Sequence, residues 1–442
     1  MATFPTGSGT ETMIAPSART LAEWLAWQET LHTRDIELGL ERCRAVARRM
    51  DLLPPPYPVV TVAGTNGKGS TVAMLERIFR AGGYRVAAYT SPHLLRYNER
   101  IRVMNEPASD ECICAAFAAV EHARLATGVP LTVFEFGTLA ALEIFRDARL
   151  DVAILEVGMG GRLDAVNIVD ADVAVIATLD IDHVEFLGRT REAIAREKAG
   201  IMRAGRPAVC SDPQVPQSLR DVAREIGVPL DLLGVSYHFV DNGEDWSWWS
   251  GDEMYDHLPK PSLHGGYQLR NAAGVLQTVG RLAHRLPVTR EAIAEALSTT
   301  VLPGRFQRIA GPVEWVLDVA HNAQAIESFV TTLNALPAAR TTHVVLGMLA
   351  TKDHASVMQS LSRVVDHWHL GTVHARQGAT AADLFATWRT LARRGRADIY
   401  DSVRDAKLGA ERAAVAGDRI LVVGSFITVG EVLSMLTLRA DR

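Results

Sequence analysis

A glycine-rich turn that follows an apolar strand decides the fold of the first part of this chain. The stretch runs Val59-Val60-Thr61-Val62-Ala63-Gly64-Thr65-Asn66-Gly67-Lys68-Gly69-Ser70. Its β-branched beginning predicts a buried strand, and the residues from Ser70 to Gly82 predict a helix. Glycines let backbone N–H groups converge on phosphate oxygens, the helix N-terminus carries positive charge, and Lys68 adds a cation. The stretch therefore predicts a phosphate-binding loop.

This loop is shorter than the standard phosphate loop. The standard signature has four residues between its first glycine and the Gly-Lys pair, and Ser or Thr directly after the lysine. Here only Thr65 and Asn66 separate Gly64 from Gly67, and Gly69 precedes Ser70. The residues of the loop leave open whether a phosphoryl group passes to water, a hydroxyl or a carboxylate.

Strand and helix patterns alternate along most of the chain. Continuously apolar strands such as 152–157 and 172–178, set between amphipathic helices, predict a parallel sheet covered on both faces. From about Pro229 to Pro261 an aromatic and acidic segment predicts a small antiparallel excursion whose tryptophans pack within a hairpin. Strand–helix alternation restarts after the breaker cluster Leu302-Pro303-Gly304.

These patterns predict an α/β protein with two domains. Residues 1–301 are expected to form a phosphate-loop ATPase-like domain with a mostly parallel sheet. Residues 302–442 are expected to form a smaller Rossmann-like α/β domain, and the length of this segment is normal for a domain.

The composition is typical of a globular protein. The 442 residues are 48% hydrophobic and 22% charged, and the net charge of −5 gives no electrostatic sign of a nucleic-acid or membrane partner. We see no secretory signal and no apolar run of about 20 residues, and therefore expect a cytoplasmic protein. The four cysteines lack metal-ligand spacing and are expected to be buried apolar residues: Cys43, Cys112, Cys114 and Cys210.

The loop sequence GTNGKGS resembles that of the ATP-dependent Mur-type amide ligases, in particular the folylpolyglutamate synthase/dihydrofolate synthase branch. Further segments resemble this family and follow in its order: 89–94 (YTSPHL) with 98–102 (NERIR), 134–138 (FEFGT), 155–165 (LEVGMGGRLDA), 196–201 (REKAGI), 302–306 (LPGRF) and 318–322 (DVAHN). The resemblance extends from about residue 37 to residue 430. The FEFGT and GGRLDA segments match the folate branch rather than the cell-wall ligases.

The resemblance implies an amide ligase that activates a carboxylate with ATP. The acyl phosphate formed in this way is attacked by a free amine. The implied reactions add L-glutamate to 7,8-dihydropteroate, giving dihydrofolate, and to tetrahydrofolate polyglutamates. Because phosphoryl transfer concentrates negative charge, positioned cations must neutralise it. The implied cofactor is Mg²⁺, as two ions, with ATP as co-substrate, and a monomer is expected.

The resemblance also assigns residues to the metal and to a modification. The implied metal ligands are Ser91, Glu156 and His183. Glu156 ends an apolar strand, and the carboxyl ends of strands are where open α/β sheets bind ligands. Lys198 corresponds to a lysine that is carbamylated in the family. Carbamylation needs a neutral amine, so the site must lower the pKa of Lys198 by burial.

Nucleotide and catalytic roles are implied in the same way. The predicted ATP-binding residues are Thr65, Asn66, Gly67, Lys68, Gly69, Ser70, Asn271, Arg305 and Asp318. The predicted catalytic residues are Lys68, Lys198, His321 and Ser425, the last two near the incoming glutamate. Ala323 stands where the family usually has proline after the His-Asn pair, a change that loosens this turn.

For the pterin, the resemblance points to three short segments. They supply an aromatic wall and carboxylate acceptors suited to a flat heterocycle with ring N–H groups. The predicted pterin-binding residues are Glu37, Leu38, Gly39, Leu40, Thr132, Val133, Phe134, Glu135, Leu163, Asp164 and Ala165.

Three alternatives stay open at this level. The first is a folylpolyglutamate synthase without dihydropteroate activity. The second is a simple phosphate-loop NTPase or kinase, which would release ADP without glutamate. The third is a nucleotide-binding regulatory or scaffold module, which would bind without turnover.

Overall fold

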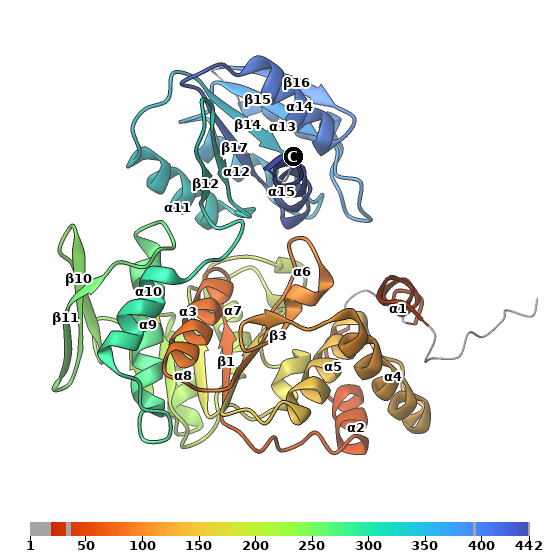
Figure 1. The fold of residues 1–442 in the computed structure, drawn as a ribbon, viewed down its shortest axis with the longest axis vertical. Coiled ribbons are helices and arrows are strands. Elements are labelled where there is room, and N and C mark those ends of the chain that lie inside the picture. Colours follow the sequence, from red (N-terminus) through yellow and green to blue (C-terminus); the bar gives the residue numbers. More distant parts are fainter. Residues whose placement is uncertain (1–18, 32–36, 392–394, 441–442) are drawn as a thin grey trace, which may run out of the picture.

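A large sheet in the first part of the chain and a smaller sheet in the last part organise the molecule into two lobes (Figure 1). The computed structural model describes residues 19–31, 37–391 and 395–440. The α/β fold class predicted from the sequence, with a mostly parallel N-terminal sheet and a second C-terminal sheet, is confirmed.

The N-terminal sheet has the order β4-β3-β2-β5-β1-β6-β7-β8. At one edge the pairs β2–β3 and β3–β4 are antiparallel. The remaining neighbouring strands pair in parallel. The strands are β1 (Val59–Ala63), β2 (Val86–Tyr89), β3 (Ile101–Val103), β4 (Glu106–Pro107), β5 (Val152–Glu156), β6 (Val173–Ile176), β7 (Ala208–Cys210) and β8 (Leu230–Leu232).

Helices cover both faces of this sheet, which is why its central strands are apolar throughout. Side chains of β1 alternate between the two cores, with Val59 and Ala63 in one and Val60 and Val62 in the other. One face carries α1 (Leu21–Gln28), α2 (Glu41–Arg49), α4 (Asp110–Thr127), α5 (Val133–Asp147), α7 (Arg191–Ala199) and α8 (Gln217–Glu225). The other carries α3 (Lys68–Ala81), α9 (Tyr267–Leu282) and α10 (Arg290–Thr299). The short helices are η2 (Tyr97–Arg100), η3 (Ala165–Ile168) and α6 (Val184–Leu187).

The predicted antiparallel excursion is confirmed. It forms a sheet of β9 (His238–Asp241), β10 (Asp245–Ser250) and β11 (Glu253–Pro259), in the order β11-β10-β9. Trp246 and Trp248 are buried against α9, and Trp248 Nε1 donates to the carbonyl of Ala273 at 3.1 Å. These tryptophans therefore pack the hairpin, as expected.

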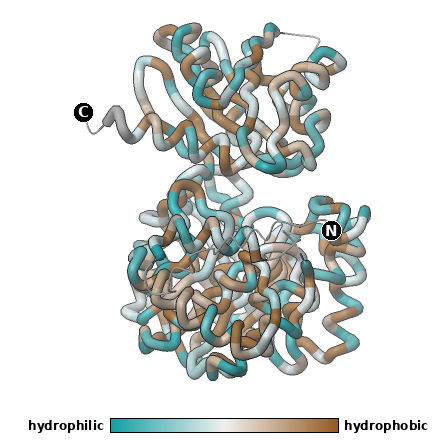
Figure 2. Tube along the Cα trace, turned by 90° about the vertical axis from the view of Figure 1, so that its right-hand side faces the viewer, coloured by the Kyte–Doolittle hydropathy of each residue, from teal (hydrophilic) through white to brown (hydrophobic). Residues whose placement is uncertain are grey.

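The C-terminal sheet has the order β12-β13-β17-β14-β15-β16, with only the β12–β13 pair antiparallel among the described strands. Its strands are β12 (Gln307–Ile309), β13 (Glu314–Leu317), β14 (Thr342–Leu346), β15 (His367–Gly371), β16 (Arg396–Tyr400) and β17 (Arg419–Val423). Its helices are α11 (Ala323–Asn334), α12 (His354–Leu361), α13 (Ala381–Leu391), α14 (Val403–Ala413) and α15 (Phe426–Ala440). Figure 2 shows apolar segments running through the interior of both lobes. The proposed domain division at residue 302 falls in the segment 300–306 between α10 and β12.

Two expectations are corrected. Helix α3 begins at Lys68 rather than near Ser70, because Gly67 already serves as its N-cap. Cys43 and Cys210 are buried, but Cys112 is exposed and Cys114 half-buried. The prediction of four buried cysteines is wrong for these two because α4 turns Ile113 and Phe117 toward the core instead. Within the described ranges, no helix is both long and apolar enough to cross a membrane.

Candidate active site

A pocket of about 830 Å³ lies between the two lobes. Residues from the carboxyl ends of strands in both sheets line it, where α/β sheets bind ligands. Every residue predicted to bind ATP or metal, or to act in catalysis, lines this pocket: Thr65, Asn66, Gly67, Lys68, Gly69, Ser70, Ser91, Glu156, His183, Lys198, Asn271, Arg305, Asp318, His321 and Ser425.

The phosphate loop is held in shape by helix α9. Gly67 has φ of 86°, and a Cβ there would lie 2.8 Å from Oδ1 of Asn271. Asn271 donates to Gln268 at 3.0 Å, and Gln268 donates to the Ser70 hydroxyl at 3.2 Å. Only glycine fits position 67, since both the left-handed backbone and the close approach exclude a side chain. The loop N–H groups and the start of α3 therefore face the pocket in a fixed arrangement.

Two lysines meet at one carbonyl of the loop. The ammonium groups of Lys68 and Lys198 donate to the carbonyl oxygen of Gly64 at 3.1 and 3.0 Å. Lys198 is buried on α7, and burial lowers its pKa to about 7, assisted by the charge of Lys68 and opposed by Asp182 and Asp164. A neutral amine is therefore well populated near neutral pH, as the carbamylation prediction requires.

The predicted metal ligands surround the same loop. Glu156 ends β5, and its Oε2 accepts the N–H of Ser91 at 3.2 Å. Burial raises the pKa of the Glu156 carboxyl, while the charge of Lys68 opposes the rise. His183 has φ of 50°, and burial lowers its pKa to about 4, so its imidazole is neutral and keeps a lone pair. A buried carboxylate, a hydroxyl and a neutral imidazole thus line one pocket, and each is a group that can donate to a divalent cation.

Asp182 joins the two lobes across the pocket. It accepts from Lys352 Nζ at 2.6 Å and from Asn322 Nδ2 at 3.4 Å, and lies 3.7 Å from Nε2 of His321. Burial alone would raise the pKa of Asp182, but hydrogen bonding to His321 and the charge of Lys352 outweigh it and hold the pKa well below its usual range. Asp182 is therefore an anion at all working pH values.

Asn66 makes a second bridge between the lobes. Its Nδ2 donates to Gln324 Oε1 at 2.7 Å and to Asn322 Oδ1 at 3.2 Å, and Asn322 Nδ2 donates back to Asn66 Oδ1 at 3.1 Å. A residue of the phosphate loop thus contacts the start of α11 directly.

Arg305 and Asp318 lie at the junction of the lobes. The Nη2 atom of Arg305 would stand 3.5 Å from a Cβ on Gly69, and its guanidinium lies 5.0 Å from the ring centre of Phe426. The buried Asp318 carboxylate accepts the N–H groups of Phe306 and Ala320, each at 2.8 Å. Asp318 therefore fixes the turn that presents Arg305 to the phosphate loop.

His321 and Ser425 lie on the C-terminal side of the pocket. His321 Nδ1 donates to the Val319 carbonyl at 2.9 Å, which leaves Nε2 toward Asp182. Ser425 is buried, and its hydroxyl accepts the N–H of Thr428 at 3.0 Å. This hydrogen bond caps the N-terminus of α15. Ala323 is the first residue of α11, a position that tolerates proline, and Asn322 caps the helix by accepting the Ala325 N–H at 2.9 Å.

Among the described residues that line the pocket, none belongs to the set predicted to bind a pterin. These residues instead gather beside it. Arg42 pairs with Glu37 at 2.6 Å and with Glu135 at 3.0 Å, and the Gly39 N–H donates to the Leu163 carbonyl at 3.2 Å. Several of them are buried in structural roles: Leu40, Thr132, Glu135, Asp164 and Ala165.

Two contacts link this group to the pocket wall. The ring of Phe134 would stand 2.6 Å from a Cβ on Gly158, a residue that lines the pocket. Asp164 Oδ2 accepts the N–H of Met159, which also lines the pocket, at 2.8 Å. Burial raises the pKa of Asp164 to about 7, although its hydrogen bonds from backbone N–H groups oppose the rise. The half-buried Leu38, Val133 and Leu163 complete the group.

Sequence reasoning missed several residues that line the pocket, namely His93, Arg100, Arg270, Gln324 and Lys352. His93 and Arg100 lie in segments that carry the family resemblance, and Arg100 Nε donates to His93 Nδ1 at 2.9 Å. Their position in those segments was the available signal. Lys352 and Gln324 had none.

Comparison with known proteins identifies the family. Residues 62–226 match the Mur ligase middle domain, and residues 304–426 match the Mur ligase glutamate ligase domain. The dihydrofolate synthase/folylpolyglutamate synthase of Escherichia coli (strain K12) is 43% identical over 423 residues, which are 96% of this chain and 97% of that protein. The chain belongs to the dihydrofolate synthase/folylpolyglutamate synthase family.

Solved members of the dihydrofolate synthase/folylpolyglutamate synthase family share this fold. An E. coli structure in complex with DHPP and ADP is 42% identical, with a TM-score of 0.90 over 96% of this chain and 99% of that one. A bifunctional enzyme with Mn, AMPPNP and L-glutamate bound is 43% identical, with a TM-score of 0.87 over 95% of this chain and 99% of that one. The predicted family and the ligase assignment are confirmed.

Proposed function

We propose that this chain joins L-glutamate to the carboxylate of 7,8-dihydropteroate and to the γ-carboxylate of tetrahydrofolate polyglutamates, through an acyl phosphate made from ATP. One observation carries the proposal. A single pocket sets the phosphate loop, Glu156 and Lys198 of one lobe opposite Arg305, Asp318 and His321 of the other. The names and bound molecules of the similar proteins support this substrate set.

In the proposed reaction the loop N–H groups and Lys68 hold the ATP phosphates. As the carboxylate attacks the γ-phosphorus, the bond to the β-phosphate breaks and ADP leaves. Negative charge develops on the transferring group, and Lys68 and Arg305 would stabilise it. The glutamate amine then attacks the acyl carbon and inorganic phosphate leaves. His321 and Ser425, which begins the turn into α15, would orient the amino acid.

The metal centre is part of the proposal. Ser91, Glu156 and His183 would hold Mg²⁺, with Lys198, once carbamylated, helping to position a second ion. Mg²⁺ would supply charge neutralisation to the phosphates. The donors fit this role, since Glu156 is a buried carboxylate beside the cationic loop and His183 is neutral. Cytoplasmic location, the monomeric state and the domain division at residue 302 remain predictions.

The deciding experiment is a coupled assay of the purified chain with ATP and glutamate. Dihydropteroate and tetrahydrofolate should each give a glutamylated product and one ADP per amide bond. Extension of tetrahydrofolate alone would favour a folylpolyglutamate synthase without dihydropteroate activity. ADP release that ignores both co-substrates would indicate a simple NTPase, and nucleotide binding without turnover a regulatory module.

Replacing Glu156 with Gln should weaken activation by Mg²⁺ at least about 10-fold, on the scale of other metal-site losses. The amide keeps the shape of the side chain but loses the charge that attracts the cation. The measurement is the Mg²⁺ dependence of kcat/KM. Glu143→Gln, on α5 outside the pocket lining and paired with Arg146, is the control. Equal Mg²⁺ dependence in both variants would remove Glu156 from the metal site.

Carbamylation of Lys198 should depend on pH. Because the pKa of Lys198 is about 7, the fraction of Lys198 in the reactive neutral form increases as the pH rises through 7. In ¹³C-bicarbonate a carbamate resonance should be weak at pH 6 and strong at pH 8, and should disappear in Lys198→Arg. A resonance that survives in Lys198→Arg, or none in either protein, would contradict the assignment.

A further inference from the structure

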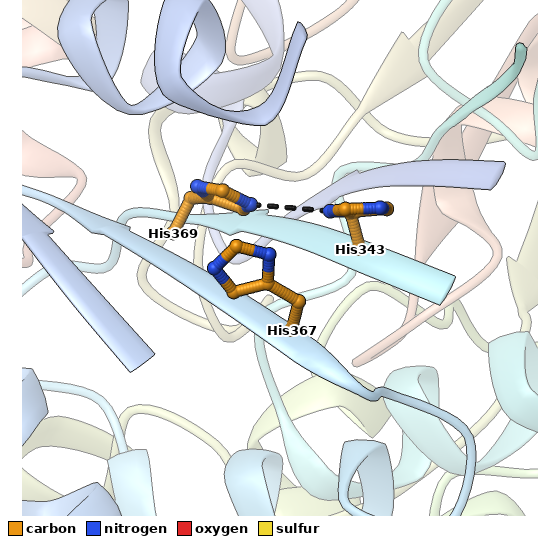
Figure 3. Close-up of side chains that lie close together, drawn as sticks. All are labelled: His343, His367 and His369. Atoms are coloured by element: carbon orange, nitrogen blue, oxygen red, sulfur yellow. Dashed lines mark hydrogen bonds between the residues drawn. The ribbon is translucent and has the colours of Figure 1, made fainter. Parts of the chain in front are cut away.

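Three histidines gather on two neighbouring strands of the C-terminal sheet (Figure 3). His343 lies on β14, and His367 and His369 lie on β15. All three are buried, and one ring nitrogen from each lies within 4.8 Å of the chosen nitrogens of the other two. Nδ1 of His343 and Nε2 of His369 are 3.3 Å apart. Two neighbouring strands thus bring three imidazoles together.

The other ring nitrogen of each histidine faces an oxygen. Nε2 of His367 lies 2.8 Å from Asp398 Oδ2, and Nδ1 of His369 lies 3.1 Å from the Tyr400 hydroxyl. Nε2 of His343 lies 3.5 Å from Asp418 Oδ2. Such oxygens take the N–H of a metal-bound imidazole and leave the opposite lone pair free for the ion. The outer contacts therefore orient three lone pairs toward a shared point.

Charges around the cluster have both signs. Burial lowers the pKa of all three histidines, for His369 to about 3, which keeps the rings neutral. Asp398 and Asp418 face the cluster, and Arg340 pairs with Asp418 at 3.0 Å. Arg396 Nη2 lies 3.1 Å from Nδ1 of His367, and Arg412 adds positive charge from α14. Arg396 is exposed, so its side chain can turn away from an incoming cation.

The cluster is separate from the site described above. His343 is the second residue of β14, and His367 and His369 are the first and third of β15, so the cluster lies toward the amino ends of two parallel strands. None of the three is among the described residues that line the pocket between the lobes. An ion bound there would tie β14 to β15 rather than take part in phosphoryl transfer.

We propose that His343, His367 and His369 bind one borderline divalent metal ion of the Zn²⁺ type, which stabilises the C-terminal lobe. A site made of imidazole nitrogens alone suits Zn²⁺, Ni²⁺ and Cu²⁺, whereas Mg²⁺ prefers sets in which oxygen ligands predominate. Tetrahedral Zn²⁺ with bonds of about 2.0–2.1 Å needs ligand nitrogens roughly 3.4 Å apart. The His343–His369 pair has this spacing, and His367, whose nitrogen lies within 4.8 Å of both, would have to move closer to complete the set. Water would take the fourth position.

The test uses the full-length protein after chelator treatment, in excess Mg²⁺ so that oxygen ligands elsewhere are occupied. Zn²⁺ titration against a competing indicator should give one tight site and a higher Tm. Co²⁺ should give the visible absorption of a four-coordinate nitrogen site. His367→Gln and His369→Gln should abolish both signals, while His183→Gln, in the ATP pocket, should keep them.

Two variants on the exposed strand β16 keep the test independent of core packing. Asp398→Asn removes the carboxylate charge beside Nε2 of His367 and should weaken Zn²⁺ binding by about 10- to 100-fold. Arg396→Gln removes a nearby positive charge and should tighten binding by about 3- to 10-fold. No Zn²⁺ uptake would mean that His343 and His369 share a proton instead, and would overturn the proposal. Uptake that is lost in His183→Gln but unchanged in Asp398→Asn and Arg396→Gln would overturn it too.

Discussion

Replacing Lys68 with alanine should lower kcat for glutamate ligation by about 10²- to 10³-fold, the usual cost of losing one preorganised group that stabilises transition-state charge. Lys68 is the first residue of α3, and its ammonium lies at the Gly64 carbonyl inside the phosphate loop. The charge matters most when the γ-phosphoryl group is in transit. The loss should therefore fall on kcat more than on the KM for the pteroate substrate.

The control for this variant is Lys68→Arg, which keeps a cation but changes its shape. It should recover part of the rate, because the position needs charge as well as geometry. Circular dichroism and Tm should match the parent for both variants, since the Lys68 side chain lies in the loop region and not in the core. Unchanged kcat in Lys68→Ala with intact folding would contradict the ligase mechanism proposed for the loop.

Replacing Asp182 with asparagine should lower kcat/KM by roughly 30- to 10³-fold, through loss of the bridge between the lobes. Asn keeps the shape but leaves Lys352, only 11% exposed at its side chain, without its anionic partner. Removing one member of a hydrogen-bonded, buried charge pair typically costs about 2–5 kcal/mol. The approach of Arg305 and His321 to the phosphate loop would become less favourable, so both kcat and KM should change.

A double-mutant cycle with Lys352→Met separates this bridge from a direct role of Asp182. If the pair acts as a unit, the double variant should be no worse than Asp182→Asn alone, because the methionine removes the unpaired charge. Additive losses would show that Asp182 acts independently of Lys352. Arg363→Met is the matched control, because Arg363 forms an ion pair with Glu327 on the surface of the same lobe. It should leave kcat/KM within about twofold.

The sequence predicted those features of the site that are set by residues adjacent along the chain. The glycine pattern from Gly64 to Gly69 fixes a loop because its backbone requirements are local, and Glu156 follows its strand directly. The bridge from Asp182 to Lys352 joins residues 170 positions apart, and nothing around Lys352 marks it. Only the packing of two lobes creates that contact, so sequence reasoning could not find it.

The histidine cluster illustrates the same limit. His367 and His369 alternate along one strand, a pattern that is common in exposed and half-buried strands alike. Their relation to His343 depends on the parallel register of β14 with β15, in which His343 lies opposite His367. The wrong prediction for Cys112 has a different origin. The apolar pattern of α4 already indicated which face of the helix is buried, but the prediction followed the general tendency of cysteine to be buried instead.

The junction residue Gly304 has a consequence for how the two lobes work together. Its φ is 69°, and a Cβ there would stand 3.1–3.3 Å from Val319, Leu94 and Val429. Arg305 follows it immediately, so any rotation about the Gly304 backbone swings the guanidinium as well. The backbone angles that set the direction of the C-terminal lobe therefore also set where this guanidinium stands, and a substitution that alters the one would displace the other.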